Sequence, residues 1–144
     1  MGRAYACLDD KDNAEKCYKR ASEGLSEPVG MMYYNDQPPE MIYYQGLARL
    51  QLNDTEGANL RFNKLIEYGQ THMNDEVKIG YFAVSLPDLQ IFDDDLNKRN
   101  RIHCLFMEAL GHLGMNDGKA EKCLDELKTL APEHTGVIMH ASFK

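Results

Sequence analysis

The stretch AEKC at residues 14–17 recurs unchanged at residues 120–123, each time just after a polar, turn-forming stretch. The turn LDDKDNA at residues 8–14 also aligns with LNDTEGA at residues 52–58, and in both a small residue follows the polar turn. Internal similarity of this kind is typical of chains built from copies of one supersecondary unit. We therefore expect stacked helix–turn–helix units, in a protein that acts by presenting a surface.

The second helix of each expected unit carries apolar or small residues at positions i, i+4 and i+7. Those positions are Ala14, Tyr18 and Ala21 in the first unit, Ala58, Phe62 and Leu65 in the second, and Ala120, Leu124 and Leu127 in the third. This spacing places the three side chains of a unit on one face of an α-helix. We therefore expect every second helix to bury one face.

These offsets are similar to those of the tetratricopeptide repeat (TPR), which has small residues in both helices, an aromatic residue in the second and a proline at the end. The matching positions are Gly2, Tyr5, Ala14, Tyr18 and Ala21 in the first copy, Gly46, Ala58 and Phe62 in the second, and Ala120 and Pro132 in the third, whose turn is one residue short. Small residues let paired helices approach closely while the aromatic fills the gap to the next pair. The resemblance implies an all-α, TPR-like helical-hairpin solenoid.

We assign residues 1–144 to a single helical-repeat domain with repeat units at about 1–24, 40–70 and 100–131. The copies lie further apart than the roughly 34 residues of one repeat, so two insertions, at about 25–39 and 71–99, must separate them. Both ends read as interrupted helical patterns, and residues 135–144 read as a further helix or a cap. We therefore expect a C-terminal fragment of a longer protein.

Proline and glycine divide the insertions from the helices. Pro28, Gly30 and Pro38 forbid a continuous helix through the first insertion, whereas Pro39 suits the first turn of the helix that follows. The second insertion carries an apolar run at residues 77–84, which predicts a short helix ending before the next proline.

A second resemblance covers most of the chain. Residues 32–40, 82–89 and 92–100 are similar to the C-terminal region of a large bacterial family of uncharacterised proteins. That resemblance implies a parent with an N-terminal β domain similar to galactose-mutarotase-like carbohydrate enzymes, followed by TPR-like repeats. None of that β domain is present in this sequence.

Charge and hydropathy exclude several function classes. The chain has a formal net charge of −7, with 16 Lys+Arg against 23 Asp+Glu. A nucleic-acid backbone or an anionic membrane needs a basic face, so we expect neither as a partner. No spanning run or signal peptide is visible, which favours a cytoplasmic location. The 4 cysteines lack a tight pairing pattern and indicate reduced thiols.

The chemistry-bearing clusters favour structural roles. The acids at 93–95 resemble the start of a calcium loop, but the glycine and the final glutamate of that motif are missing, so we expect them to cap the following helix. His103, Cys104 and His112 cannot share one ion, because residues eight apart on a helix are separated by about 12 Å. The sequence contains no Gly-x-Ser-x-Gly elbow or phosphate-binding glycine loop. We expect no catalytic residue, cofactor or metal.

Five residues are candidates for partner binding. By TPR register the concave face of the second unit carries Tyr43, Leu47 and Gln51, although a neighbouring unit could equally bury them. The first insertion adds Tyr33 and Tyr34, which either anchor that loop to the core or contact a partner.

We therefore expect a non-catalytic interaction or domain-docking scaffold whose partner is a protein, a peptide or its own upstream domain. One alternative is an accessory helical domain of a carbohydrate-active enzyme whose catalytic β domain lies upstream. Another is a homo-oligomer formed through exposed solenoid ends.

Overall fold

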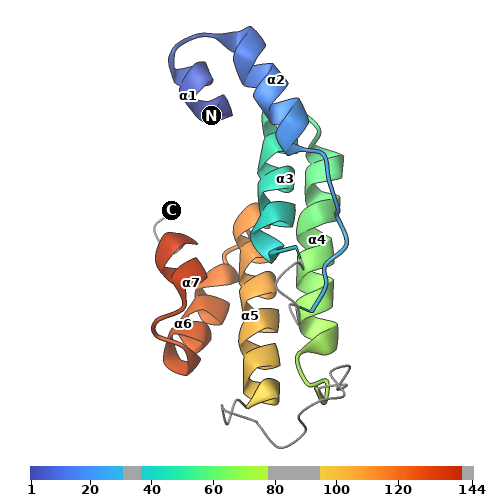
Figure 1. Ribbon diagram of the computed structural model, residues 1–144, viewed down its shortest axis with the longest axis vertical. Coiled ribbons are helices and arrows are strands. Elements are labelled where there is room, and N and C mark those ends of the chain that lie inside the picture. Colours follow the sequence, from blue (N-terminus) through green and yellow to red (C-terminus); the bar gives the residue numbers. More distant parts are fainter. Residues whose placement is uncertain (31–36, 78–94, 141–144) are drawn as a thin grey trace, which may run out of the picture.

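The computed structural model describes residues 1–30, 37–77 and 95–140, and these form α-helices joined by turns and loops, with no strand among them (Figure 1). The helices are α1 (Gly2–Cys7), α2 (Lys11–Ala21), α3 (Pro39–Gln51), α4 (Thr55–His72), α5 (Leu96–Met115), α6 (Ala120–Leu130) and α7 (Thr135–His140). The all-α class expected from the sequence is confirmed for the described residues.

Six of these helices form three helix–turn–helix pairs in chain order: α1–α2, α3–α4 and α5–α6 (Figure 1). Each pair lies close to one of the three expected repeat units, and α7 occupies the stretch where a further helix or cap was expected. Each helix packs against the next one along the chain, and α3 also packs against α5.

The first two turns share one local design. Asp9 has a φ of 57° and Asn53 a φ of 61°, a left-handed conformation that short polar residues tolerate better than most. The aspartate that follows each of them caps the next helix: Asp10 accepts from the backbone N–H of Asn13 and Asp54 from that of Gly57. The aligned turn sequences therefore fold alike.

The third turn differs from the other two. Asn116 takes the left-handed conformation with a φ of 52°, but Lys119 at the N-cap of α6 makes no capping bond through its side chain. Ala120 comes four positions after Asn116, whereas Ala14 comes five positions after Asp9. This confirms that the third turn is one residue short.

Small residues face aromatic rings inside the first two pairs. A Cβ atom added at Gly2 would lie 2.6 Å from a ring carbon of Tyr18, and one added at Gly46 would lie 2.3 Å from a ring carbon of Phe62. Both distances are far below van der Waals contact, so glycine is required for the observed approach. The sequence placed the aromatic in the gap to the next pair; the structure shows that it also contacts the small residue of its own pair, and the Phe62 ring lies against Gly114 of α5 as well.

The core centres on the crossing of α4 and α5, the two longest helices. Glycines bring their backbones together: a Cβ at Gly69 would lie 2.6 Å from the carbonyl oxygen of Cys104, and one at Gly111 would lie 2.6 Å from that of Phe62. Fully buried side chains surround the crossing: Phe62, Leu65, Met107 and Leu110. Among the described helices, α4 and α5 make the most extensive contact with each other.

The first pair contributes little to that core. α1 buries none of its residues and α2 buries only Ala14, while Ala21 is exposed and Tyr18 is half-buried. The expectation that every second helix buries one face is therefore wrong for α2, although it holds for α4 and α6. The physical reason is position, because α1 and α2 lie at one end of the molecule (Figure 1).

Parts of the second insertion lie outside the described residues, including all of the expected short helix at 77–84 except Val77. The backbone N–H of Val77 donates to the side-chain oxygen of Asn97 at the start of α5 (2.9 Å). Within the described ranges, every helix is too short or too polar to cross a lipid bilayer.

Candidate functional site

One side of α3 presents a line of side chains to solvent. Met41 is 48% exposed and Tyr44 is 38% exposed. Leu47 is half-buried and Gln51 is exposed further along the same helix. Spacings of three and four residues place these four side chains on one face of the helix. We call Met41, Tyr44, Leu47 and Gln51 the α3 stripe.

Tyr43 does not belong to the α3 stripe. It is only 5% exposed, and its ring lies 6.0 Å, centroid to centroid, from that of Phe62 on α4. Burial raises the pKa of the Tyr43 hydroxyl. The sequence left open whether Tyr43 binds a partner or is buried; the structure shows that it is buried, and its neighbour Tyr44 is exposed instead.

Leu47 is half-buried against the core, whereas Gln51 is exposed at the C-terminal end of α3. Gln51 also lines an open cleft between the C-terminal end of α3 and the first helix pair. Ala14 and Tyr18 of α2 line the same cleft. The remaining two candidates, Tyr33 and Tyr34, lie outside the described residues.

The short helix α7 extends the surface beside α3. The hydroxyl of Tyr44 lies 3.0 Å from Nε2 of His140, so the two helices are tied by a hydrogen bond. Ile138 and Met139 of α7 are 64% and 62% exposed. Together with the α3 stripe, they place large exposed apolar and aromatic side chains on two helices that contact each other.

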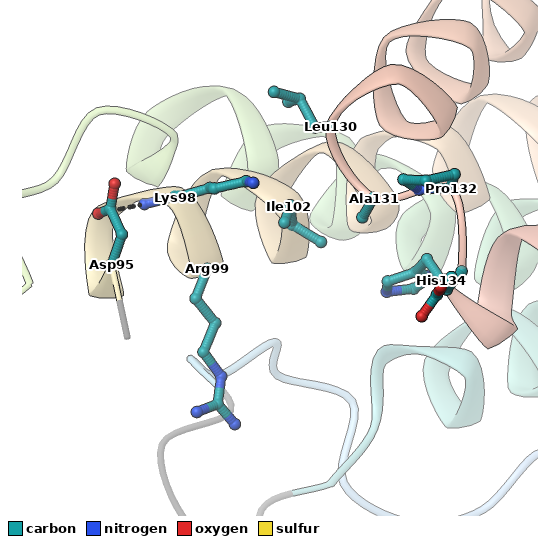
Figure 2. Close-up of a pocket in the computed structure, with 9 residues that line it drawn as sticks. Asp95, Lys98, Arg99, Ile102, Leu130, Ala131, Pro132 and His134 are labelled. Atoms are coloured by element: carbon teal, nitrogen blue, oxygen red, sulfur yellow. Dashed lines mark hydrogen bonds between the residues drawn. The ribbon is translucent and has the colours of Figure 1, made fainter. Parts of the chain in front are cut away.

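A second open pocket lies between the first turns of α5 and the segment that joins α6 to α7 (Figure 2). Its lining carries both signs of charge, with Lys98 and Arg99 against Asp95 and Glu133. Figure 2 shows the side chains of Lys98 and Arg99 running in different directions, so they do not converge on one point. The pocket therefore lacks the clustered charge that an anion site requires.

Asp95 in this pocket has a structural role. Its side-chain oxygen accepts a hydrogen bond from the backbone N–H of Lys98 (3.0 Å), and it is the N-cap of α5. The sequence-based assignment of a capping role is confirmed for this residue, while the two preceding aspartates lie outside the described residues.

The histidines and the cysteine of α5 point to separate partners. Nε2 of His103 donates to the carbonyl oxygen of Val29 (3.0 Å), and Nδ1 of His112 lies 2.8 Å from a carboxylate oxygen of Asp117. Burial raises the pKa of the Cys104 thiol to about 11, which keeps it protonated at neutral pH. The described part of the chain contains no group of three or more His, Cys, Asp or Glu side chains placed to hold a metal ion.

All four cysteines are free. Cys123 is buried, and burial raises the pKa of its thiol to about 11. Cys17, at the matching place in the first unit, is half-buried. The buried thiols of Cys104 and Cys123 fit small packing residues better than reactive nucleophiles, which need a lowered pKa and access.

Comparison with known proteins gives no matching family model and no matching solved structure. The likeness to the TPR family therefore remains a prediction from the repeated offsets.

Sequence reasoning missed three residues of the exposed surface, namely Met41, Ile138 and Met139, and chose Tyr43 in place of Tyr44. Counting back from Gln51 by seven and ten positions would have found Tyr44 and Met41, because these offsets keep to one helical face. No local signal could have shown that α7 docks on α3, because this docking depends on a contact between residues 96 positions apart.

Proposed function

We propose that this chain is a non-catalytic, TPR-like interaction scaffold that binds a protein or peptide on the side formed by the α3 stripe and α7. The single observation that carries the proposal is the gathering of large exposed apolar side chains on these two joined helices, Met41 and Tyr44 from one and Ile138 and Met139 from the other. Exposed aromatic and methionine side chains are enriched at protein interfaces.

The arrangement of the helices supports the TPR-like part of this proposal. Three pairs follow one another in the chain, each helix packs on the next, and α3 packs on α5, which is the pattern that stacked hairpins produce. The close contacts of Gly2 with Tyr18 and of Gly46 with Phe62 repeat at matched positions. Stacked hairpins commonly act by offering an extended surface to a partner.

The chemistry of the described residues supports a non-catalytic role. The capping aspartates Asp10 and Asp54 have lowered pKa values because they accept hydrogen bonds, from Asn13 in the first case and chiefly from the backbone N–H of Gly57 in the second. General acids need a raised pKa instead. The thiols of Cys104 and Cys123 are shifted away from nucleophilic character.

Introducing negative charge on the apolar surface tests whether it binds a partner. The double variant Met41→Glu with Ile138→Glu places two carboxylates on the apolar side without removing any hydrogen bond of either side chain. Leu60→Glu is the matched control, because Leu60 is 53% exposed on α4 and lies outside the α3 stripe and α7. We expect the double variant to lose the partners that wild type and control capture by cross-linking in native lysate. Full capture by a folded double variant would reject this surface.

The alternative proposal is an accessory domain of a carbohydrate-active enzyme, and it rests on the resemblance of residues 32–40, 82–89 and 92–100. Under this alternative the occupant of the surface is an upstream β domain of the same polypeptide. The coding sequence preceding Met1 tests it directly. A reading frame that encodes no β domain there would remove this alternative and leave the scaffold proposal in place.

A further inference from the structure

The N-terminal end of α7 is held by a histidine in one specific protonation state. Nδ1 of His134 lies 3.3 Å from the backbone nitrogen of Val137, which can only donate and which shares its hydrogen between this nitrogen and the carbonyl oxygen of His134 (3.0 Å). An imidazole nitrogen accepts a hydrogen bond only when it carries no proton. His134 therefore caps α7 as the neutral ring with its proton on Nε2, and a second proton would occupy the nitrogen that accepts.

The C-terminal end of α7 is anchored by a second histidine. Nδ1 of His140 lies 2.7 Å from the carbonyl oxygen of Gly136, so Nδ1 carries a proton and donates. In the neutral ring Nε2 then accepts from the hydroxyl of Tyr44. His140 is 2% exposed and lies 5.8 Å, ring to ring, from Tyr43 and from Phe106.

α7 covers apolar surface that belongs to α5 and α3. A Cβ atom added at Gly136 would lie 2.3 Å from the ring of Phe106, so the α7 backbone rests directly on that ring. Val137 is buried in the same core cluster, and the ring of His134 lies 4.7 Å from that of Phe106. Loss of α7 would expose Phe106 and the edge of Tyr43.

The charged and titratable groups around His134 come from several elements. Glu40 at the start of α3 favours the protonated ring of His134 by its negative charge. His103 on α5 lies close enough that, besides burial, a charge on His134 lowers its pKa. Asp95, Lys98 and Arg99 of α5 and Glu133 line the same pocket (Figure 2). The rings of Tyr43 and Tyr44 lie next to that of His140, and the positive charge of Arg3 on α1 favours the ionised form of Tyr43.

Burial outweighs Glu40 at this site. It lowers the pKa of His134, with Glu40 acting in the opposite direction, and it also lowers the pKa of His103. The docked protein therefore holds His134 neutral at pH 7. An undocked His134 would take up a proton near the ordinary histidine value of about 6.5.

We propose that α7 is an acid-released cover, in which protonation of His134 removes the N-cap of the helix and frees α7 from α3 and α5. Release needs only a proton and is reversed by raising the pH. It exposes Phe106 and Tyr43, next to the α3 stripe. This inference concerns the position of α7 alone and does not depend on the partner-binding function proposed above.

Amide hydrogen exchange of the full chain, followed by NMR, tests the proposal. Between pH 7.5 and pH 5.5 we expect the protection factor of the Val137 amide to fall about five-fold, the change that loss of a typical N-cap produces. The amide of Phe62 in α4 reports global unfolding and should stay much better protected than that of Val137 at both pH values, which separates local release from global unfolding. Unchanged protection at Val137 would overturn the proposal.

Substitution of the cap identifies the titrating group. His134→Asn keeps an oxygen that can cap the helix but does not titrate, so its protection factor at Val137 should change less than two-fold over the same pH range. His72→Gln is the matched control, because His72 lies on α4 beside Asp75, and it should behave as wild type. If His134→Asn loses protection as wild type does, His134 is not the switch.

Two further variants guard against ambiguous results. His134→Ser is a second non-titrating cap and replaces the asparagine variant if that protein does not fold. Gly136→Val drives a side chain into the ring of Phe106 and should undock α7 at pH 7.5. Its spectrum then supplies the reference for the released state. An acid spectrum of wild type that moves away from this reference would reject release of α7.

Discussion

The α4–α5 crossing and the α1–α2 pair both contain close contacts at glycine, but the two regions bury very different amounts of apolar side chain. At the crossing, glycines bring two long helices together and the surrounding side chains are fully buried. In the first pair, Gly2 meets Tyr18 just as closely, yet α2 buries only Ala14. A matched local motif therefore does not give matched stability, because stability depends on how much apolar surface the neighbouring elements cover.

This difference makes α1–α2 the part of the molecule that should open first. Regions with few buried apolar contacts open locally at low free energy, whereas a packed core opens only with global unfolding. Equivalent substitutions in the two regions therefore provide direct tests of the comparison.

The largest expected effect comes from a charge at the small position of the second helix. Ala58 is 0% exposed, and Ala58→Arg would bury a cation without a partner and cost about 4 kcal/mol or more. The equivalent Ala14→Arg should unfold only the first pair. Circular dichroism in a urea series measures both: Ala58→Arg should lack a folded baseline, and Ala14→Arg should lose helix while keeping the main transition. Equal losses would refute the comparison.

Removal of the aromatic ring should show the same contrast on a smaller scale. Phe62 is fully buried, so Phe62→Ala should lower the free energy of unfolding by about 4 kcal/mol. Tyr18 is half-buried in the first pair, and Tyr18→Ala should lower it by about 1 kcal/mol or less. Urea midpoints of the two variants decide the matter. A Tyr18 variant as unstable as the Phe62 variant would show that α2 belongs to the core.

Acid should weaken the α5 side of the molecule and spare the first pair. Burial lowers the pKa of His103 and of His134, so the folded state binds fewer protons than the unfolded state. The free energy of unfolding should therefore be constant above about pH 6.5 and fall as the pH decreases below that value. Residues 1–71 contain no histidine, so fraying of α1–α2 should not change between pH 7.5 and pH 5.5.

The variant His103→Gln sharpens this prediction. Glutamine keeps a donor for the carbonyl oxygen of Val29 but does not titrate, so the variant should lose less stability than wild type between pH 7.5 and pH 5.5. Urea unfolding at the two pH values gives the difference. Parallel losses in both proteins would show that His103 contributes nothing to the acid sensitivity.

The smallest effect is expected at Leu8, the exposed C-cap residue of α1. Leu8 is 77% exposed, so Leu8→Glu should change the free energy of unfolding by less than about 0.5 kcal/mol. The same variant tests homo-oligomer formation through this end of the molecule. Light scattering over a concentration series should give the same mass for variant and wild type if the α1 surface is not an interface between copies. A mass that falls only in the variant would establish such an interface.

Local chemistry allowed much of the helix layout to be predicted. Pro39 begins α3 as expected, Asp95 caps α5, and the turns at Asp9 and Asn53 fold alike because their sequences carry the same capping aspartate. These features depend on residues within a few positions of one another, so a single sequence contains the information. The exposed surface was harder to predict, since Tyr43 and Tyr44 are adjacent and similar in chemistry.

By itself, the sequence determined that the described chain is helical and where its three pairs lie, because these follow from short-range periodicity and turn chemistry. Only the tertiary structure decided that Gly69 and Gly111 bring α4 against α5, that Tyr43 is buried while Tyr44 is exposed, and that α7 rests on Phe106. Those outcomes depend on the distances and angles between helices far apart in the chain, which helical periodicity does not fix.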